Sequence, residues 1–244
     1  MKRYLLLTGL LVLLFTAACG AAGEIGKQEL VVPTAAPTAT AVAEAETEKS
    51  LYDDFSQTVE GWEEVHVVTS QAVGKPKSGA SLKEGMLVFD FQEMETYLYK
   101  FYGKASTADV VIEAKVQGTG KLQNGMALVC RASEDKSAWY EARVTSVGKY
   151  GIYRFDQSAK DAGKNPYVLI KEGGLPVDVF GPTKENVVRF TCQGDQLKLE
   201  ANGNELATAQ DANLSEGGLP GVGAMSSNEL PVSIRFDYFS YGQP

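Results

Sequence analysis

The stretch GMALVCRASEDKSAWYEARVTSVGKYGIYRF, residues 125–155, decides the fold of this chain. It contains runs in which apolar side chains alternate with other residues, and turn-forming residues separate these runs. Alternation at a period of two is typical of β-strands, because successive side chains point to opposite faces of a sheet. The stretch therefore predicts consecutive antiparallel strands over 126–131, 139–145 and 150–155.

Similar runs recur along most of the chain, and no segment shows a capped helical stripe. The Asn202-Gly203 pair is the strongest two-residue signal for a hairpin turn. Strands that follow one another without intervening helices indicate an antiparallel sandwich of two sheets and argue against a parallel α/β fold. The additional strands are expected over 86–91, 97–102, 110–116, 187–192, 196–201 and 232–239.

Composition and charge exclude several classes of protein. The 244 residues include 23 Lys and Arg against 31 Asp and Glu, which gives a net charge of −8. A nucleic-acid binder needs clustered basic charge, so nucleic acid is not an expected partner. One His leaves no room for a multi-histidine metal site, and we expect no cofactor. A mean hydropathy of −0.15 argues against several membrane spans.

The first 18 residues are predicted to be a signal peptide. Lys2 and Arg3 precede an apolar run that is shorter than the roughly 20 residues needed to span a membrane. The small residues before Cys19 resemble a bacterial lipobox, although Thr16 stands where Leu is usual. The resemblance implies cleavage before Cys19, acylation of this residue, and export to the cell envelope with a membrane anchor.

Residues 19–50 are predicted to be the acylated cysteine followed by a disordered linker. The segment is rich in Ala, Thr, Pro and Glu, and it contains no aromatic residue. Such a composition cannot bury enough apolar surface to offset the entropy of ordering the chain. One β domain over 51–244 is expected to follow.

The two remaining cysteines are expected to form a disulfide within the core. Cys130 shares a predicted strand face with Leu128, and Cys192 shares one with Phe190. An even pair in an exported protein is best interpreted as bonded, with two buried free thiols as the alternative.

Several segments of the domain resemble the concanavalin A-like lectin/glucanase (laminin-G-like) jelly rolls. The resemblance implies a two-sheet jelly roll in which the first and last strands pair. It covers nearly all of 51–244 but says little about function, because this fold serves lectins, glycosidases and adhesion modules. The segments that carry it are 51–56 with Gly61-Trp62, 125–131, 139–144, 148–153, 192–203, 221–223 and 235–239.

The same resemblance raises the question of a structural calcium site. Pairing of the terminal strands would bring Asp53, Asp54 and Asp237 near one another, and calcium is bound by carboxylate and carbonyl oxygens. The alternative, which we favour, is that these acids are solvated turn and edge residues. No metal site is therefore predicted.

Motifs for catalysis are missing from the sequence. Glucanases of this fold commonly carry Glu-x-Asp-x-x-Glu along one strand, and no such string occurs here. Asp109 and Glu113 would lie roughly 13 Å apart along a strand, too far for a retaining pair. His66 has no accompanying nucleophile motif and is more simply a surface or packing residue. An enzymatic role is therefore not favoured.

The hairpin that follows residue 125 offers a candidate binding surface. If Tyr140 and Ala142 face the core, a tryptophan, a glutamate and two arginines share the other face. An aromatic ring beside hydrogen-bonding groups is suited to a sugar. The alternative is a solvated face with the tryptophan half covered by a loop, and the 157–166 loop is a candidate cover. The candidate ligand-binding residues are Arg131, Trp139, Glu141, Arg143 and Tyr153.

The sequence thus predicts an exported, lipid-anchored lipoprotein with a non-catalytic recognition module. The favoured partner is a glycan. One alternative is a structural or adhesion module that binds a cell-surface protein through an edge strand or a sheet face. A glycoside hydrolase-like enzyme without the usual motif is the second.

Acylation predicts that labelled palmitate enters the wild-type protein in its host and does not enter the Cys19→Ser variant. The thiol is the atom that the lipid would modify, so its replacement removes the acceptor. Equal labelling of both proteins would contradict the lipobox interpretation.

Overall fold

The computed structural model describes residues 49–57, 60–68, 77–118, 120, 124–174, 181 and 183–244. The predicted signal peptide, Cys19 and nearly all of the predicted linker lie outside the described residues. The described part belongs to one compact unit, Ala45–Pro244. No helix within this part has the length and the hydrophobicity needed to cross a membrane.

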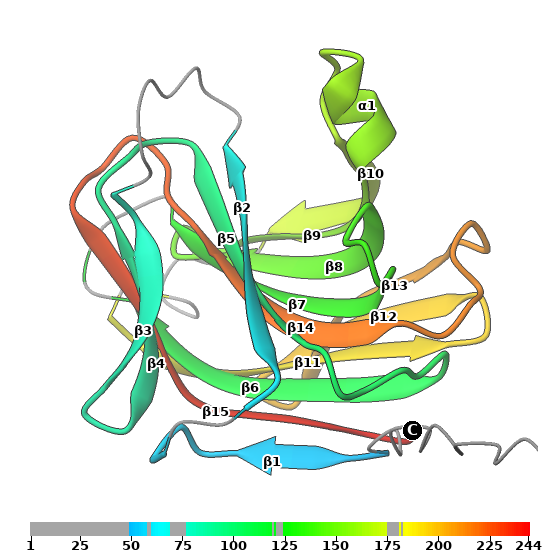
Figure 1. The fold of residues 1–244 in the computed structure, drawn as a ribbon, viewed down its shortest axis with the longest axis horizontal. Coiled ribbons are helices and arrows are strands. Elements are labelled where there is room, and N and C mark those ends of the chain that lie inside the picture. Colours follow the sequence, from blue (N-terminus) through cyan, green and yellow to red (C-terminus); the bar gives the residue numbers. More distant parts are fainter. Residues whose placement is uncertain are drawn as a thin grey trace, which may run out of the picture. The chain divides into compact units, whose positions relative to one another are not determined.

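Two antiparallel sheets face each other, as the sequence predicted (Figure 1). The seven-stranded sheet has the order β10 (Tyr167–Gly174), β9 (Lys149–Asp156), β8 (Ala138–Thr145), β7 (Gly125–Ala132), β14 (Leu219–Met225), β5 (Thr96–Tyr102), β2 (Trp62–Val68). The eight-stranded sheet has the order β13 (Asn204–Gln210), β12 (Gln196–Ala201), β11 (Glu185–Gln193), β6 (Val110–Gly118), β15 (Val232–Gly242), β4 (Met86–Phe91), β3 (Gly79–Lys83). Strand β1 (Leu51–Asp53) pairs with β15, and helix α1 (Gln157–Asp161) follows β9. The fold is a concanavalin A-like jelly roll.

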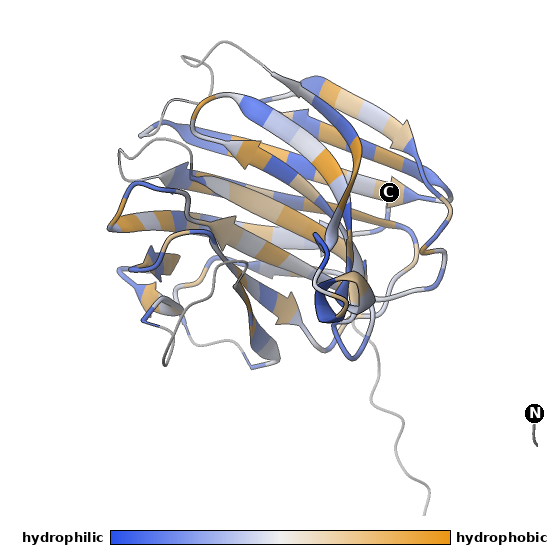
Figure 2. Ribbon diagram, turned by 90° about the horizontal axis from the view of Figure 1, so that it is seen from above, coloured by the Kyte–Doolittle hydropathy of each residue, from blue (hydrophilic) through white to orange (hydrophobic). Residues whose placement is uncertain are grey.

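The inner faces of the two sheets form the main core. Apolar and polar residues alternate along many strands, which Figure 2 shows as alternating colours. In β6 the buried positions alternate with half-buried ones over the first seven residues, and in β11 they recur at every second residue. Burial of this apolar surface stabilises the sandwich, and its largest fully buried side chains include Phe89, Phe91, Tyr102, Tyr140, Phe190, Phe236 and Phe239.

The predicted disulfide is present and joins the two sheets. Cys130 in β7 and Cys192 in β11 are bonded, with their Cα atoms 6.7 Å apart. Both residues are fully buried within the main core. The bond therefore links strands of opposite sheets, as the shared apolar faces of the two cysteines indicated.

The Asn202-Gly203 turn is also confirmed. It connects β12 to β13, and φ is +50° at Asn202 and +80° at Gly203. Positive φ at both central residues is typical of the hairpin turns that match the twist of the flanking strands.

The acids near the terminal strands make separate contacts. Pairing of Leu51 with Tyr241 confirms that the first strand lies beside the last one. Asp53 accepts hydrogen bonds from the backbone N–H of Phe55 and from Nε1 of Trp62. Asp237 instead forms an ion pair with Lys115. Among the described residues, no group of three or more acids, histidines or cysteines is arranged to hold a metal ion.

The disulfide closes a loop of 62 residues. The loop-entropy relation predicts that its loss lowers the free energy of unfolding by about 4 kcal/mol. We expect the Cys130→Ala/Cys192→Ala double variant to show this loss in urea unfolding. The wild-type protein after reduction and alkylation should also be destabilised, and unchanged stability in both would contradict the expectation.

Candidate ligand-binding site

The outer face of the seven-stranded sheet, the face turned away from the main core, is strongly concave. Tyr97 on β5 and Tyr167 on β10 lie five strands apart in this sheet. Five steps of about 4.8 Å would separate them by about 24 Å in a flat sheet. Their ring centroids are 4.9 Å apart, so the sheet curls until side chains from its two wings meet. We call this surface the concave face.

A glycine at the centre of the sheet allows a second contact across the concave face, between Tyr99 and Trp139. Gly223 on β14 pairs with Tyr99 on one side and with Ala127 on the other. A Cβ at Gly223 would lie 2.5 Å from the Tyr99 ring, so only glycine allows the ring to lie over this strand. Tyr99 thereby reaches Trp139 on β8, with ring centroids 5.0 Å apart.

Large aromatic side chains fill one half of the concave face and form a second core. Trp139 stacks on Phe155 with ring centroids 3.7 Å apart, and both are fully buried. Phe101 contacts the same tryptophan from β5. This half of the concave face therefore has no open surface for a ligand.

Glu141 lies within this second core and is fully buried. Its Oε2 accepts hydrogen bonds from Nε1 of Trp139 at 2.7 Å and from the hydroxyl of Tyr99 at 2.8 Å. Its Oε1 accepts one from Nε of Arg143. A buried carboxylate needs such donors to offset its desolvation, and here it has three.

Arg143 carries the compensating positive charge and is 7% exposed. Its Cζ lies 3.9 Å from the ring centroid of Tyr167, 4.5 Å from that of Tyr153 and 4.7 Å from that of Tyr97. Cations are attracted to the faces of aromatic rings, so this cage holds the guanidinium in place. Burial alone would lower the pKa of Arg143, but attraction to Glu141 outweighs it and raises the pKa above its usual value.

The buried tyrosines remain neutral donors in this network. Burial raises the pKa of Tyr99 well above its usual value, and the negative charge of Glu141 adds to the effect. Burial likewise raises the pKa of Tyr167. Because Tyr99 donates its only hydroxyl proton to Glu141, Tyr167 must donate to Tyr99, whose oxygen lies 3.0 Å away.

The structure brings four of the five predicted binding residues together. Trp139, Glu141, Arg143 and Tyr153 lie on the concave face, whereas Tyr140 and Ala142 face the main core. Trp139 and Glu141 are buried, so neither offers an open platform. A direct role of these four residues in binding stays a prediction.

Arg131 is not part of this group, so the expectation that it shares the surface is wrong. Its φ of +52° interrupts the alternation at the end of β7. Its Nε donates to the backbone oxygen of Ala108 at 2.6 Å, and its Nη1 donates to that of Leu214 at 2.9 Å. Arg131 therefore holds the loops around Ala108 and Leu214 by hydrogen bonds and does not reach the concave face.

The other half of the concave face contains an open depression of about 670 Å³. Arg143 lies between the half-buried Tyr97 and Tyr153, and Lys149 and Glu172 are exposed at the rim. Nη2 of Arg143 is buried without a hydrogen-bond partner among the described residues. The depression is also lined by Thr145, Tyr150, Gly151, Gly173, Gly174 and Met225.

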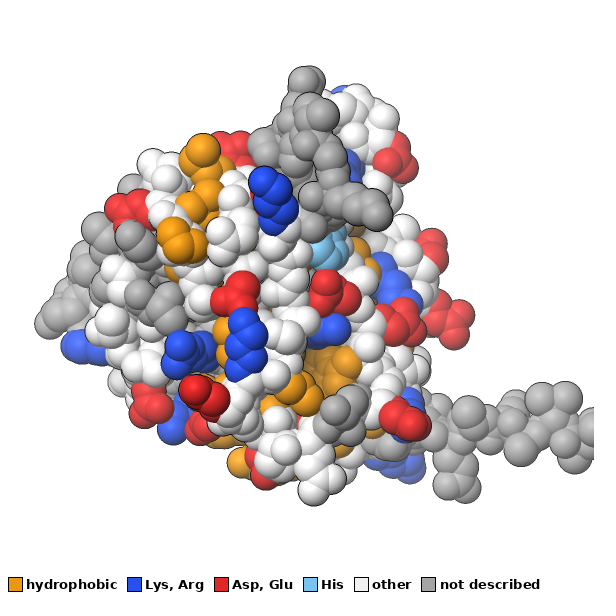
Figure 3. Space-filling view, turned by 60° about the vertical axis from the view of Figure 1, so that its left-hand side comes forward, with side chains coloured by type: hydrophobic (Ala, Val, Ile, Leu, Met, Phe, Trp, Pro, Cys, Tyr) orange, Lys and Arg blue, Asp and Glu red, His pale blue; other side chains and the backbone are white. Residues whose placement is uncertain are grey.

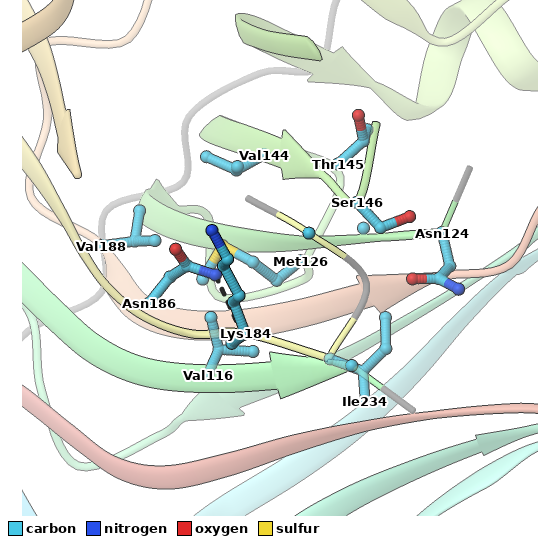
Figure 4. A pocket seen from close by; sticks show the side chains of 13 residues that line it. Val116, Asn124, Met126, Val144, Thr145, Ser146, Lys184, Asn186, Val188 and Ile234 are labelled. Atoms are coloured by element: carbon cyan, nitrogen blue, oxygen red, sulfur yellow. Dashed lines mark hydrogen bonds between the residues drawn. The ribbon is translucent and has the colours of Figure 1, made fainter. Parts of the chain in front are cut away.

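Two further cavities are less suited to a ligand. One of about 40 Å³ lies between the two sheets (Figure 4). It is lined by apolar side chains and by the polar residues Asn124, Thr145, Ser146, Lys184 and Asn186. This volume accommodates only a few waters. Another of about 200 Å³ lies beside Trp62, Leu82 and other residues near the sheet edges. The face toward β2 and β3 carries interspersed acidic and basic side chains (Figure 3).

The predicted covering loop lies elsewhere. Residues 157–166, which include α1, connect the end of β9 to the start of β10 (Figure 1). The depression lies beside Lys149, at the start of β9. Accordingly, none of residues 157–166 lines the depression.

Sequence reasoning missed Tyr97, Lys149 and Glu172 as lining residues. Tyr97 was placed in a predicted strand, but alternation within one strand does not reveal that strands β5 and β8 approach across a curved face. Glu172 lies in β10, a strand that the alternation did not predict. The abundance of tyrosine, 11 residues in this chain, is the signal that could have suggested a second aromatic cluster.

Comparisons with known proteins support the fold. No protein-family model matches the chain, and no curated protein matches it in sequence. Among solved structures, the carbohydrate-binding module CBM66 from Bacillus subtilis has a TM-score of 0.54 and 16% identity, covering 72% of this chain and 91% of that one. A Bacillus licheniformis β-glucanase has a TM-score of 0.56 and 11% identity, and the match covers 81% of this chain and 100% of the glucanase. A Bacillus subtilis protein of unknown function with a galectin-like fold has a TM-score of 0.58 and 10% identity, and the match covers 79% of this chain and 94% of that protein.

The Glu141–Arg143 pair predicts strong energetic coupling. In the Arg143→Met variant the Glu141 carboxylate stays buried without its counter-charge, so we expect a loss of about 3–5 kcal/mol in the free energy of unfolding. The Glu141→Gln/Arg143→Met double variant should lose less than the Arg143→Met variant. Urea unfolding of the wild type, both single variants and the double variant measures the coupling. If the losses in the free energy of unfolding of the two single variants add up to the loss of the double variant, the two charges are not energetically coupled.

Proposed function

We propose that this protein is the carbohydrate-binding module of an exported, lipid-anchored lipoprotein, and that it is not an enzyme. The observation that carries the proposal is the depression on the concave face, in which Arg143 lies between Tyr97 and Tyr153. Its volume of about 670 Å³ falls within the range of small-molecule sites.

The chemistry of the depression suits a hydroxyl-rich, uncharged ligand. The charge of Arg143 is balanced by Glu141, and the rim carries one base, Lys149, and one acid, Glu172. Tyrosine rings offer apolar surface to the C–H groups of a sugar, while hydroxyl and guanidinium groups bond its oxygens. The similar solved structures include one described as a carbohydrate-binding module and one described as a β-glucanase, which supports a glycan as the ligand.

The contacts of Glu141 support a non-catalytic role. A glycosidase needs two carboxyl groups that flank the scissile bond. Glu141 is fully buried and already accepts bonds from Trp139, Tyr99 and Arg143, so it cannot touch a substrate without breaking this network.

A protein partner is the second candidate function, and strand β10 is the feature that favours it. Among the described strands, β10 pairs only with β9 and forms an edge of the seven-stranded sheet. Val168 and Leu169 on this strand are 41% and 46% exposed. An exposed apolar edge strand can pair with a strand of another protein.

Binding to a glycan array, followed by calorimetry on the glycans that bind, tests the first proposal. Tyr153→Ala removes one wall of the depression and is expected to weaken binding by about tenfold or more. Tyr52→Ala is the matched control, because Tyr52 is 66% exposed and stacks on Tyr238 in the other sheet. The control should bind within about twofold of the wild type, on the scale where tenfold is 1.4 kcal/mol.

Absence of binding to every glycan would overturn the carbohydrate proposal and favour the protein-partner alternative. Equal losses in Tyr153→Ala and Tyr52→Ala would place the glycan outside the depression. Release of products from a polysaccharide by the wild type, lost in Glu141→Gln, would overturn the non-catalytic role.

A further inference from the structure

Three neighbouring strands place Arg143, Gly151 and Glu172 in one row across the depression. Gly151 on β9 pairs with Arg143 on β8 and with Glu172 on β10. Residues directly opposite each other in antiparallel strands point to the same face of a sheet. Because Arg143 lies on the concave face, Glu172 lies there too, and both residues line the depression. The row therefore carries a charged side chain at each end and no side chain at its middle position.

The ring of Tyr153 occupies the space over this middle position. A Cβ at Gly151 would lie 2.7 Å from Cε2 of Tyr153 and 2.9 Å from its hydroxyl oxygen. The hydroxyl end of the ring thus lies over Gly151, between Arg143 and Glu172. Burial raises the pKa of Tyr153, and Arg143 opposes this effect. The negative charges of Glu141 and Glu172 raise the pKa further, which agrees with a Glu172 carboxylate close to this ring.

Glu172 brings an unused hydrogen-bond acceptor to the depression. Its side chain is exposed and has no hydrogen bond or ion pair with another residue in the described part of the chain. The carboxylate of Glu141, by contrast, is buried and already accepts three hydrogen bonds. The hydroxyl of Thr145 donates to the backbone oxygen of Lys149 and accepts from its N–H, so the β8–β9 turn already uses it. Glu172 is therefore available to accept protons from a ligand.

The opposite side of the row carries only donors. The guanidinium of Arg143 and the ammonium of Lys149 donate hydrogen bonds and cannot accept them, whereas a carboxylate only accepts. The depression thus has an acceptor on the β10 side and donors on the β8 side and at the β8–β9 turn. A sugar hydroxyl both donates and accepts, so a sugar ring placed beside Tyr153 satisfies both sides.

Resting on the proposed carbohydrate-binding function, we infer that Glu172 determines the specificity of the site by accepting hydrogen bonds from two adjacent free hydroxyl groups of a neutral sugar. The two oxygens of its carboxylate lie side by side, and each accepts one hydroxyl proton. A sugar whose hydroxyls are methylated or acetylated lacks these protons. An acidic sugar is disfavoured because its charge is repelled by Glu172.

The test combines variants of Glu172 with a change in the ligand. The probes are the neutral hexasaccharides of β-1,4-glucan, β-1,3-glucan, β-1,4-mannan and β-1,4-galactan, with any further glycan that binds in the array. A neutral glycan that binds is measured again as its O-methylated derivative, which keeps the ring and its oxygens but lacks the hydroxyl protons. The proteins are the wild type, Glu172→Ala, Glu172→Gln and the matched control Glu216→Gln. Glu216 is exposed in the loop between β13 and β14 and does not line the depression.

Calorimetry should show a loss of affinity of about tenfold or more in Glu172→Ala, because hydrogen bonds to a charged acceptor are lost. Glu172→Gln keeps one acceptor oxygen and should lose about three- to tenfold. Methylation of the glycan should weaken binding to the wild type by about tenfold or more, but to Glu172→Ala by less than about threefold. Glu216→Gln should bind within about twofold of the wild type. Because Glu172 is exposed, its variants should unfold at the same urea concentration as the wild type.

Affinity of Glu172→Ala within about twofold of the wild type would overturn the inference. An equal effect of methylation on both proteins, or tighter binding of an acidic glycan than of any neutral one, would do the same. In these cases the carbohydrate-binding proposal would stand if Tyr153→Ala still loses binding. Absence of binding to all probes and to the array would remove that proposal and this inference together.

Discussion

The burial of the Glu141 carboxylate constrains every side chain around it. A charge without access to water is tolerated only when donors surround it, and here Trp139, Tyr99 and Arg143 supply them. These donors come from two strands, β8 and β5, that do not touch each other in the sheet. The network therefore requires the curvature of the sheet and, once formed, holds it.

The protein consequently has two cores with different chemistry. The core between the sheets is almost wholly apolar, and the Cys130–Cys192 disulfide crosses it from one sheet to the other. The second core, on the concave face, combines aromatic rings with a buried ion pair. Apolar packing needs only matching volume, whereas buried polar groups also need matched geometry. The second core thus fixes side-chain positions more strictly, and these positions define the border of the depression.

Much of the fold followed from the sequence, and the reason is that alternation reports local geometry. The shared faces of Cys130 and Cys192, and the separation of Trp139 and Glu141 from Tyr140 and Ala142, depend only on the period of two within one strand. Alternation did not predict every strand. Strand β14 contains Pro220 and two glycines, and only the resemblance of residues 221–223 to a closing strand pointed to it. Strand β10 is exposed on both faces over Val168 and Leu169, and nothing in the sequence pointed to it.

The candidate site was only partly predictable, because it depends on contacts between distant strands. The sequence placed Trp139, Glu141 and Arg143 on one face but gave no sign that Tyr97 and Tyr167 would close over them. Arg131 does not share this face because its φ is positive, and a positive φ at a residue other than glycine has no turn signal in the sequence that would predict it. Curvature of the sheet arises from the sum of many packing contacts and has no local signature.

The position of the first and last strands of the β domain has a practical consequence. Leu51 at the start of β1 pairs with Tyr241 near the end of β15, so the domain begins and finishes side by side in the eight-stranded layer. The depression opens on the outer surface of the opposite layer. A segment attached at either end of the domain therefore joins the layer that does not carry the depression. The architecture is therefore suited to multivalent display, in which linked copies gain avidity from a high effective concentration.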